Sequence, residues 1–132
     1  MTPDELRRDE ARRWLKVAVH DLNAAAILRE PEPSGSVFHS QQAAEKSAKA
    51  LLAFYDVPFR RTHDLRELGA QCIQIDASLE PIVNEAADLT GYAVTFRYLD
   101  APGEPDSEEA AAALAIARRV YEEISSRIEA GS

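Results

Sequence analysis

The sequence has little cysteine, little glycine and no long apolar run, and each of these shortages argues against a particular class of protein. Its single cysteine, Cys72, cannot form an internal disulfide and lacks the companions of a zinc cluster, which suits a reducing compartment. No apolar run is long enough for a signal peptide or a membrane-spanning helix. With only five glycines and many alanines, the composition favours helix over sheet. We therefore expect one soluble, cytoplasmic and largely helical domain over residues 1–132.

An excess of basic residues is also absent. The chain carries 15 basic and 23 acidic side chains, which gives a net charge of −8 with histidine neutral. A protein that coats nucleic acid needs a basic surface, so this balance excludes bulk nucleic-acid binding. A small local phosphate site stays possible. The apolar fraction of 45% is that of an ordinary globular domain and excludes disorder throughout.

Turn-forming residues divide the chain into helical lengths, and no segment alternates with the period of a strand. We expect long helices at about 4–29, from Ser36 to about Asp56, from Ser78 to about Phe96 and from Asp106 to about Ile128, and a short one from Asp64 to about Ile75. Four long helices and one short helix joined by short connections predict an all-α, up-and-down antiparallel bundle.

Local signals support these boundaries. Ser36 is a candidate cap for the second helix, and Asp64/Glu67 and Asp106/Glu109 have the spacing of capping boxes. The apolar residues of the first helix recur at spacings of three, four and seven, which predicts one buried stripe. That stripe consists of Leu6, Trp14, Val17, Ala18, Leu22, Ala25 and Leu28.

The second predicted helix carries the most informative polar residues. Four of them follow i, i+3, i+4, i+7 spacing and share one face, namely Gln42, Glu45, Lys46 and Lys49. Periodicity alone favours a surface ion pair between Glu45 and Lys49. Gln41 lies on the apolar stripe, where a buried amide needs a partner on a neighbouring helix. Two of the chain's three lysines lie in this stretch, which leaves a functional role open.

The turn that follows is basic. Arg60, Arg61 and His63 come just before the N-terminus of the short helix, where free N–H groups and the helix dipole favour an anion. A phosphate site is one interpretation, and a solvated turn in which Asp64 simply caps the helix is the simpler one. Arg97, next to Tyr98 at the end of the fourth helix, is equally explained by the helix dipole.

No catalytic or cofactor motif accompanies these residues. His20 and His39 lack metal-ligand spacing, and Asp21 and Asp64 form no recognisable metal motif. No serine lies in a nucleophile-elbow context, and there is no glycine-rich phosphate loop. We expect no metal and no cofactor.

Taken in order, the same residues resemble the HEPN domain family of prokaryotic helical proteins. The match consists of Ala18-x-x-Asp21-Leu22-x-x-Ala25, Gln41-Gln42-Ala43-Ala44-Glu45-Lys46-x-x-Lys49-Ala50-Leu51-Leu52, His63-Asp64-Leu65-x-x-Leu68 and Arg97-Tyr98. The glutamine–glutamate–lysine segment is the most specific part. The polar residues Asp21, Gln41, Gln42, Glu45 and Asp64 thereby become residues of the family motif.

The resemblance implies a helical bundle that pairs as a homodimer, with a minimal nucleotidyltransferase as a frequent partner. It also implies that many such proteins are toxins that cleave RNA without a metal. Their signature is an arginine followed after four to six residues by a histidine. The arginine would stabilise the developing phosphate charge and the histidine would transfer the proton.

The sequence departs from that signature at its decisive position. If Arg97 is the family's arginine, the histidine is expected at position 102, 103 or 104, which hold Pro102, Gly103 and Glu104. No histidine follows His63, and the spacing from Arg60 or Arg61 to His63 is too short. We therefore predict no RNase activity by the familiar mechanism.

Three functions remain. The leading hypothesis is a non-catalytic, homodimeric HEPN protein that binds a nucleotide or acts with a minimal nucleotidyltransferase, as in a toxin–antitoxin-like module. The alternatives are a metal-independent RNase toxin with a displaced histidine, supplied as His63 of a second copy, and a helical interaction module without a ligand. The candidate phosphate contacts are Lys46, Lys49, Arg60, Arg61, His63 and Arg97, and Tyr98 offers a stacking surface.

Overall fold

The computed structural model describes residues 1–95 and 104–131, with residues 90–95 as backbone only. Its helices are α1 (Pro3–Leu28), α2 (Pro33–Phe54), α3 (Leu65–Ile75), α4 (Glu80–Thr95) and α5 (Ser107–Ala130), and a single 3-10 turn, η1 (Ala77–Leu79), precedes α4. No strand occurs in these ranges. The prediction of an all-α bundle with four long helices and one short helix is confirmed. No helix in the described ranges has the length and apolar character that crossing a membrane requires.

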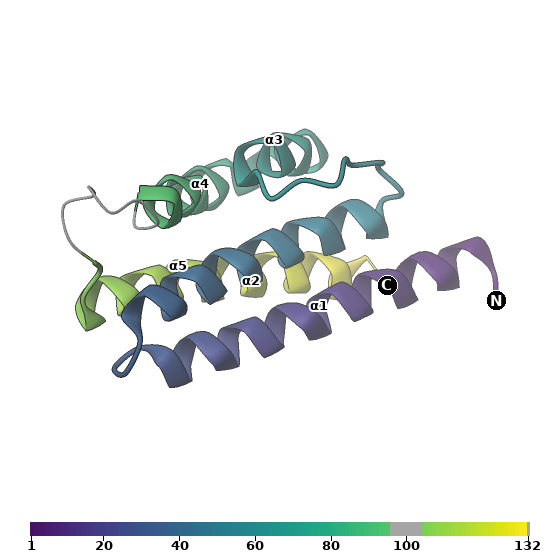
Figure 1. Cartoon of the computed structure of the whole chain (residues 1–132). Coiled ribbons are helices and arrows are strands. Elements are labelled where there is room, and N and C mark those ends of the chain that lie inside the picture. Colours follow the sequence, from purple (N-terminus) through teal and green to yellow (C-terminus); the bar gives the residue numbers. More distant parts are fainter. Residues whose placement is uncertain (96–103, 132) are drawn as a thin grey trace.

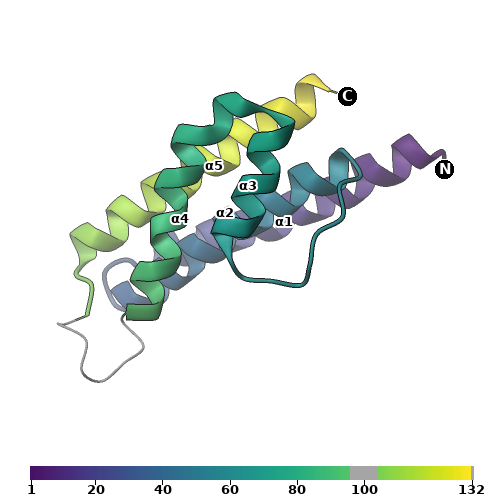
Figure 2. The same ribbon diagram turned by 90° about the horizontal axis from the view of Figure 1, so that it is seen from above.

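The helices form two layers. α1 and α2 lie side by side and antiparallel, with α5 packed against both, while α3 and α4 form a hairpin that covers α2 and α5 (Figures 1 and 2). The linker of residues 55–64 does not continue outward from the end of α2. It runs back along α2 before α3 begins (Figure 2). This return places the basic turn above the middle of α2.

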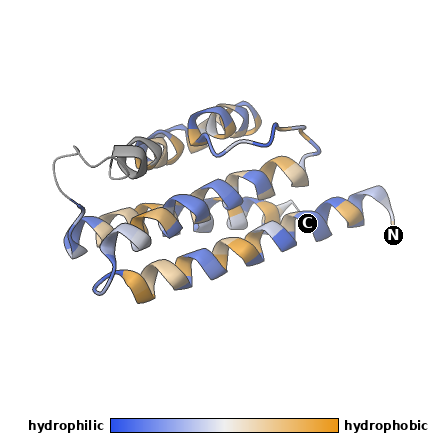
Figure 3. Ribbon diagram, viewed as in Figure 1, coloured by the Kyte–Doolittle hydropathy of each residue, from blue (hydrophilic) through white to orange (hydrophobic). Residues whose placement is uncertain are grey.

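Each helix buries one face. Apolar and polar residues alternate along the ribbons (Figure 3), as expected for amphipathic helices around a common core. The largest fully buried apolar side chains include Leu51, Leu52, Leu68, Leu79 and Ile124. Fully buried alanines on three helices, such as Ala18, Ala43 and Ala117, leave room for close packing of α1, α2 and α5.

The helix starts partly agree with the sequence predictions. The capping box of α5 is confirmed, with Glu109 N donating to Asp106 Oδ1 (2.8 Å) and Asp106 N to Glu109 Oε1 (3.4 Å). Asp64 caps α3 through the N–H of Arg66 (2.9 Å), but the second half of the predicted box is wrong, because Glu67 pairs with Arg60 instead.

The predicted start of α2 is also wrong. The helix begins three residues before Ser36, at Pro33, whose fixed φ suits the first helical turn. The Ser36 side chain is fully buried and donates to the carbonyl of Ala25 on α1 at 2.6 Å. Ser36 therefore joins two helices instead of capping one.

The single buried stripe predicted for α1 is only partly correct. Ala18, Leu22 and Ala25 are buried, but Leu6 and Val17 are 53% and 44% exposed. At 3.6 residues per turn Leu6 and Val17 fall on the outer side of the helix, away from Leu22. Spacings of three, four and seven do not separate two stripes on opposite faces of one helix.

A polar cluster ties the corner between α3 and η1 to α5. Arg127 Nε donates to Asp76 Oδ2 at 2.6 Å, and the backbone N–H and hydroxyl of Ser78 donate to Asp76 Oδ1 at 3.0 and 2.6 Å. The hydrogen bond from the Ser78 hydroxyl, followed by those from Arg127 and from the Ser78 backbone N–H, lowers the pKa of Asp76 to about 2.

The Asp76 cluster predicts a stability effect at acid pH. The folded-state pKa lies below the ordinary value, so the carboxylate stabilises the fold above about pH 4. That stabilisation is lost as the pH falls toward 2. Asp76→Asn, which keeps the capping oxygen, should lower the melting temperature at pH 7 and have a shrinking effect from pH 4 to pH 2. A difference in melting temperature that stays constant over this range would contradict the assignment.

The contact of α3 with α4 at Gly69 predicts a second stability effect. A Cβ at Gly69 would lie 2.2 Å from Cγ1 of Val83, a buried β-branched side chain with little rotamer freedom in a helix. Gly69→Ala should therefore destabilise the protein by about 1–3 kcal/mol in urea unfolding, although alanine is the better helix former. The same change made in a Val83→Ala background should cost clearly less. Equal costs in both backgrounds would rule out the clash.

Candidate functional site

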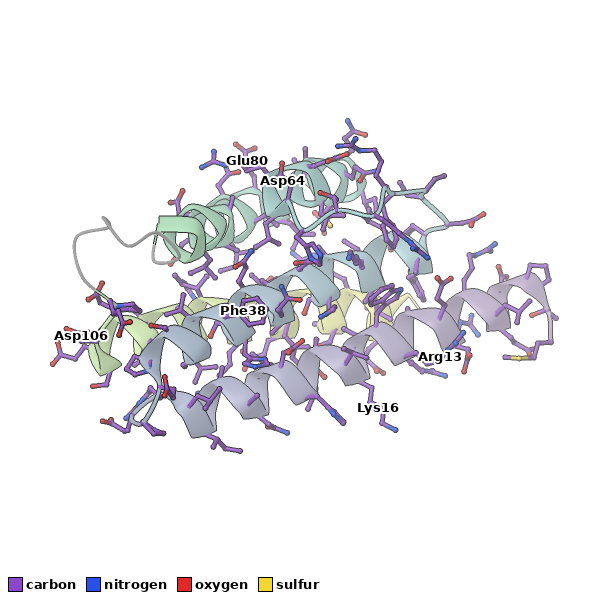
Figure 4. The ribbon with its side chains drawn as sticks, viewed as in Figure 1. Arg13, Lys16, Phe38, Asp64, Glu80 and Asp106 are labelled. Atoms are coloured by element: carbon purple, nitrogen blue, oxygen red, sulfur yellow. The ribbon has the colours of Figure 1, made fainter. Side chains whose placement is uncertain are left out.

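The polar face of α2 forms a connected set of hydrogen bonds with α1 and the linker. We call this set the polar network. It consists of Asp21 from α1, His39, Gln42, Glu45, Lys46 and Lys49 from α2, and His63 from the linker. Figure 4 shows the side chains of this region, with Phe38 on α2 and Asp64 at the start of α3 as landmarks.

Glu45 lies at the centre of the polar network and is fully buried. Its Oε1 accepts from Lys49 Nζ at 3.1 Å and lies 2.8 Å from Nδ1 of His63, while Gln42 Nε2 donates to Oε2 at 3.4 Å. A buried carboxylate is tolerated only with such partners, because its loss of hydration must be offset. The polar side chains around Glu45 are therefore required by its burial.

The predicted surface ion pair of Glu45 and Lys49 is wrong, since the pair is buried. Lys49 is only 8% exposed, and its ammonium group lies 5.4 Å from the ring centre of Trp14. Trp14 in turn contacts Phe59 of the linker edge to face, with ring centres 6.3 Å apart. The returning linker covers this part of α2, which helical spacing alone does not reveal.

His63 is exposed to solvent, whereas its partner Glu45 is buried. Its side chain is 78% exposed, although Nδ1 contacts the fully buried Glu45. The Glu45 carboxylate accepts a hydrogen bond from Nδ1–H of His63, which fixes the ring orientation and leaves Nε2 as the ring nitrogen that Glu45 does not contact. An exposed imidazole held in this way is available to a phosphate oxygen or a transferable proton.

A second carboxylate–imidazole pair lies further along α2. Asp21 Oδ1 lies 2.8 Å from Nδ1 of His39, and Lys46 Nζ donates to Asp21 Oδ2 at 3.3 Å. Lys46 also donates to Gln42 Oε1 at 3.1 Å, which links the two pairs. The structure thus brings together most of the residues of the family motif from three chain segments.

The two arginines of the basic turn differ in their surroundings. Arg60 Nε and a terminal nitrogen donate to Glu67 at 2.7 and 2.8 Å, and this interaction raises the pKa of Arg60 and lowers that of Glu67. Arg61 is exposed and has no ion pair with any described residue. The turn therefore has one guanidinium group, that of Arg61, which lies next to His63 and forms no ion pair with a described residue.

The remaining predicted residues contribute less. Gln41 is buried as expected, but its Oε1 has no hydrogen-bond partner in the part of the chain that the structure describes. Arg97 and Tyr98 lie outside the described residues. Burial raises the pKa of Cys72 to about 12, so its thiol is not a nucleophile near neutral pH. No group of three potential metal ligands occurs among the described residues.

The burial of Glu45 predicts a large cost of removing its charge. Glu45→Gln should lower the free energy of unfolding by about 3 kcal/mol or more, because Lys49 would then lie buried beside a neutral group. Glu67→Gln is the matched control, since it removes the carboxylate of the exposed pair with Arg60 and should have little effect. Urea unfolding of both variants measures the difference, and equal effects would contradict the central role of Glu45.

Comparison with models of known protein families identifies the family of the chain. The HEPN domain model matches residues 11–128, from the first half of α1 to the end of α5. No curated protein and no solved structure matches the chain. The matched range contains every residue of the polar network. The chain therefore belongs to the HEPN domain family.

Proposed function

We propose that this HEPN protein is a non-catalytic homodimer that binds the phosphate groups of a nucleotide at the basic turn of residues 60–63. The observation that carries the proposal is the exposed imidazole of His63, which the buried carboxylate of Glu45 holds in place. A small protein needs such anchored groups to bind an anion against a net charge of −8.

The neighbouring side chains support binding of an anion at this place. Arg61 is exposed next to His63, and Arg60 can leave Glu67 at little cost because exposed ion pairs contribute little free energy. A guanidinium group binds phosphate oxygens with two parallel hydrogen bonds. We therefore assign direct phosphate contacts to Arg60, Arg61 and His63.

The two lysines have a different assignment. Lys46 and Lys49 already donate to Asp21 and Glu45, so their charges are compensated inside the polar network. We propose that both lysines hold the polar network in position beneath the basic turn and do not contact the phosphate themselves. From the family motif, Arg97 is proposed as a further phosphate contact and Tyr98 as a stacking surface for the base.

Absence of catalysis is part of the proposal. It is supported by Pro102, Gly103 and Glu104, which hold the positions where the RNase signature requires a histidine if Arg97 is its arginine. A minimal nucleotidyltransferase is the partner we propose from family membership. A gene for such an enzyme next to that of this protein would support the pairing.

One observation favours a second function. The contact of Glu45 with His63 is the arrangement of a general acid–base pair, in which the carboxylate orients the ring. An RNase that uses His63 instead of the missing histidine is therefore the second candidate. It differs from the first in cleaving RNA and not only binding it.

Calorimetric titration with ATP, GTP and a short RNA tests the phosphate site. We expect binding that weakens about tenfold or more in His63→Ala and in Arg61→Ala, since a charge-assisted hydrogen bond is worth about 1.5–3 kcal/mol. Arg118→Ala, which changes an exposed arginine on α5, is the control and should bind like the native chain. No binding of any of the three at millimolar concentration would overturn the proposal.

The same variants separate the two candidate functions. The native chain should leave a labelled RNA intact over hours, and its expression should not arrest growth. RNA cleavage that is lost in His63→Ala would establish the RNase instead.

A further inference from the structure

A hollow lies at the end of the bundle where α1 begins and where α2 and α5 end (Figure 1). Its volume is about 470 Å³, which is within the range of pockets that bind small molecules. It is lined by two arginines and an aspartate of α1, by residues 54–56 at the end of α2 and by Gly131 at the end of α5. None of these residues belongs to the polar network or to the basic turn.

Asp56 occupies a position in this hollow that disfavours both its backbone and its charge. Its φ is 56°, a left-handed conformation for which glycine is the usual residue after a helix. The turn is fixed by a hydrogen bond from Val57 N to the carbonyl of Leu52 (2.8 Å), which is typical of a Schellman motif. The carboxylate also lies at the negative end of the α2 dipole, and the last turn of α2 has no basic residue. A carboxylate at this position therefore needs a cation nearby.

Arg7 supplies only part of that positive charge. Its guanidinium group also pairs with Asp4, and its Nη1 lies 4.0 Å from Asp56 Oδ2, which is beyond hydrogen-bond distance. The Asp56 side chain is 80% exposed. The carboxylate is therefore open to a positively charged group of a ligand.

Arg8 provides the opposite charge in the same hollow. It is half-buried and forms no ion pair with any described residue. A free guanidinium group binds a carboxylate through two parallel hydrogen bonds. Two arginines would repel a ligand that is only cationic, and two aspartates would repel one that is only anionic. The combination of Arg8 and Asp56 therefore fits a zwitterion.

Two aromatic rings give the hollow an apolar wall. Tyr55 is 48% exposed and contacts Phe54 edge to face, with ring centres 5.1 Å apart. A flat ring of a ligand gains by packing against such a surface. Gly131 lets α5 end close to this wall, because a Cβ at this position would lie 2.9 Å from Cε1 of Phe54.

We propose that this hollow binds an α-amino acid with an aromatic side chain. Arg8 binds the carboxylate of the ligand, Asp56 binds its ammonium group and Tyr55 packs against its ring. The site is separate from the basic turn and does not depend on the nucleotide binding proposed above.

An NMR titration of the full chain with L-phenylalanine tests the ligand class. The amide signals of Asp56 and Gly131 should shift and saturate, and that of His63 should not respond. Phenethylamine lacks the carboxylate and 3-phenylpropionate lacks the ammonium group, so each should bind at least tenfold more weakly than L-phenylalanine. No shift at millimolar L-phenylalanine, or equal binding of either analogue, would overturn the proposal.

Two variants test the assigned contacts. Arg8→Ala and Asp56→Asn should each weaken binding of L-phenylalanine at least tenfold, because each removes one charged partner. Arg12→Ala is the matched control, since it removes an exposed arginine one turn further along α1 that does not line the hollow. It should bind L-phenylalanine like the native chain. Native-like binding in Arg8→Ala or in Asp56→Asn would contradict the assigned contacts.

Asp56→Gly separates ligand binding from stability. Glycine relieves the left-handed backbone and removes the negative charge at the end of α2, so the melting temperature should rise by a few degrees. Binding of L-phenylalanine should nevertheless be lost. If Asp56 only stabilised the turn, the melting temperature would fall. A fall in melting temperature would therefore overturn the assignment of Asp56 to the ligand.

Discussion

The buried carboxylate of Glu45 is the constraint on which the arrangement of the site depends. A charge with no exposed surface must find cations and donors nearby, and Glu45 finds them on its own helix and on the linker. Lys49 follows from helical spacing, because it lies one turn further along α2. His63 comes from 18 residues away, so Glu45 also determines where the linker lies.

This dependence explains why the fold joins a tight bundle to a polar site. The alanine-rich contacts of α1, α2 and α5 leave little space between helices, so the polar side chains of α2 project at the edge of the core. There they meet Asp21 of α1 on one side and the linker on the other. One helix thereby supplies both core packing and the support of the site.

Those features of the fold and of the site that depend on residues close together in the sequence could be predicted from it. Helix lengths, the capping box at Asp106 and the shared face of Gln42, Glu45, Lys46 and Lys49 all follow from spacing. Family membership followed from the order of the motifs. Those features depend on residues within one or two helical turns of each other.

What could not be predicted depends on distant segments. Whether the Glu45–Lys49 pair is buried depends on the return of the linker, and Leu6 and Val17 have the same spacing whether they face the core or the solvent. Ser36 looked like a cap because its partner, the carbonyl of Ala25, belongs to another helix. In each case the outcome depends on a contact between two different elements, whereas sequence periodicity describes only one helix.

The linker gives the site one further property. Residues 58–63 donate no backbone-to-backbone hydrogen bond in the described structure and are held mainly by side chains: Phe59 on Trp14, the Pro58 carbonyl on Gln71 Nε2, and His63 on Glu45. Segments held in this way open locally at a small fraction of the free energy of global unfolding, so their amides exchange with solvent first. The residues that face a ligand thus lie on the least protected segment between α2 and α3. A phosphate bound to Arg61 and His63 would hold the linker in its place on α2 and slow that exchange, which couples ligand binding to local order.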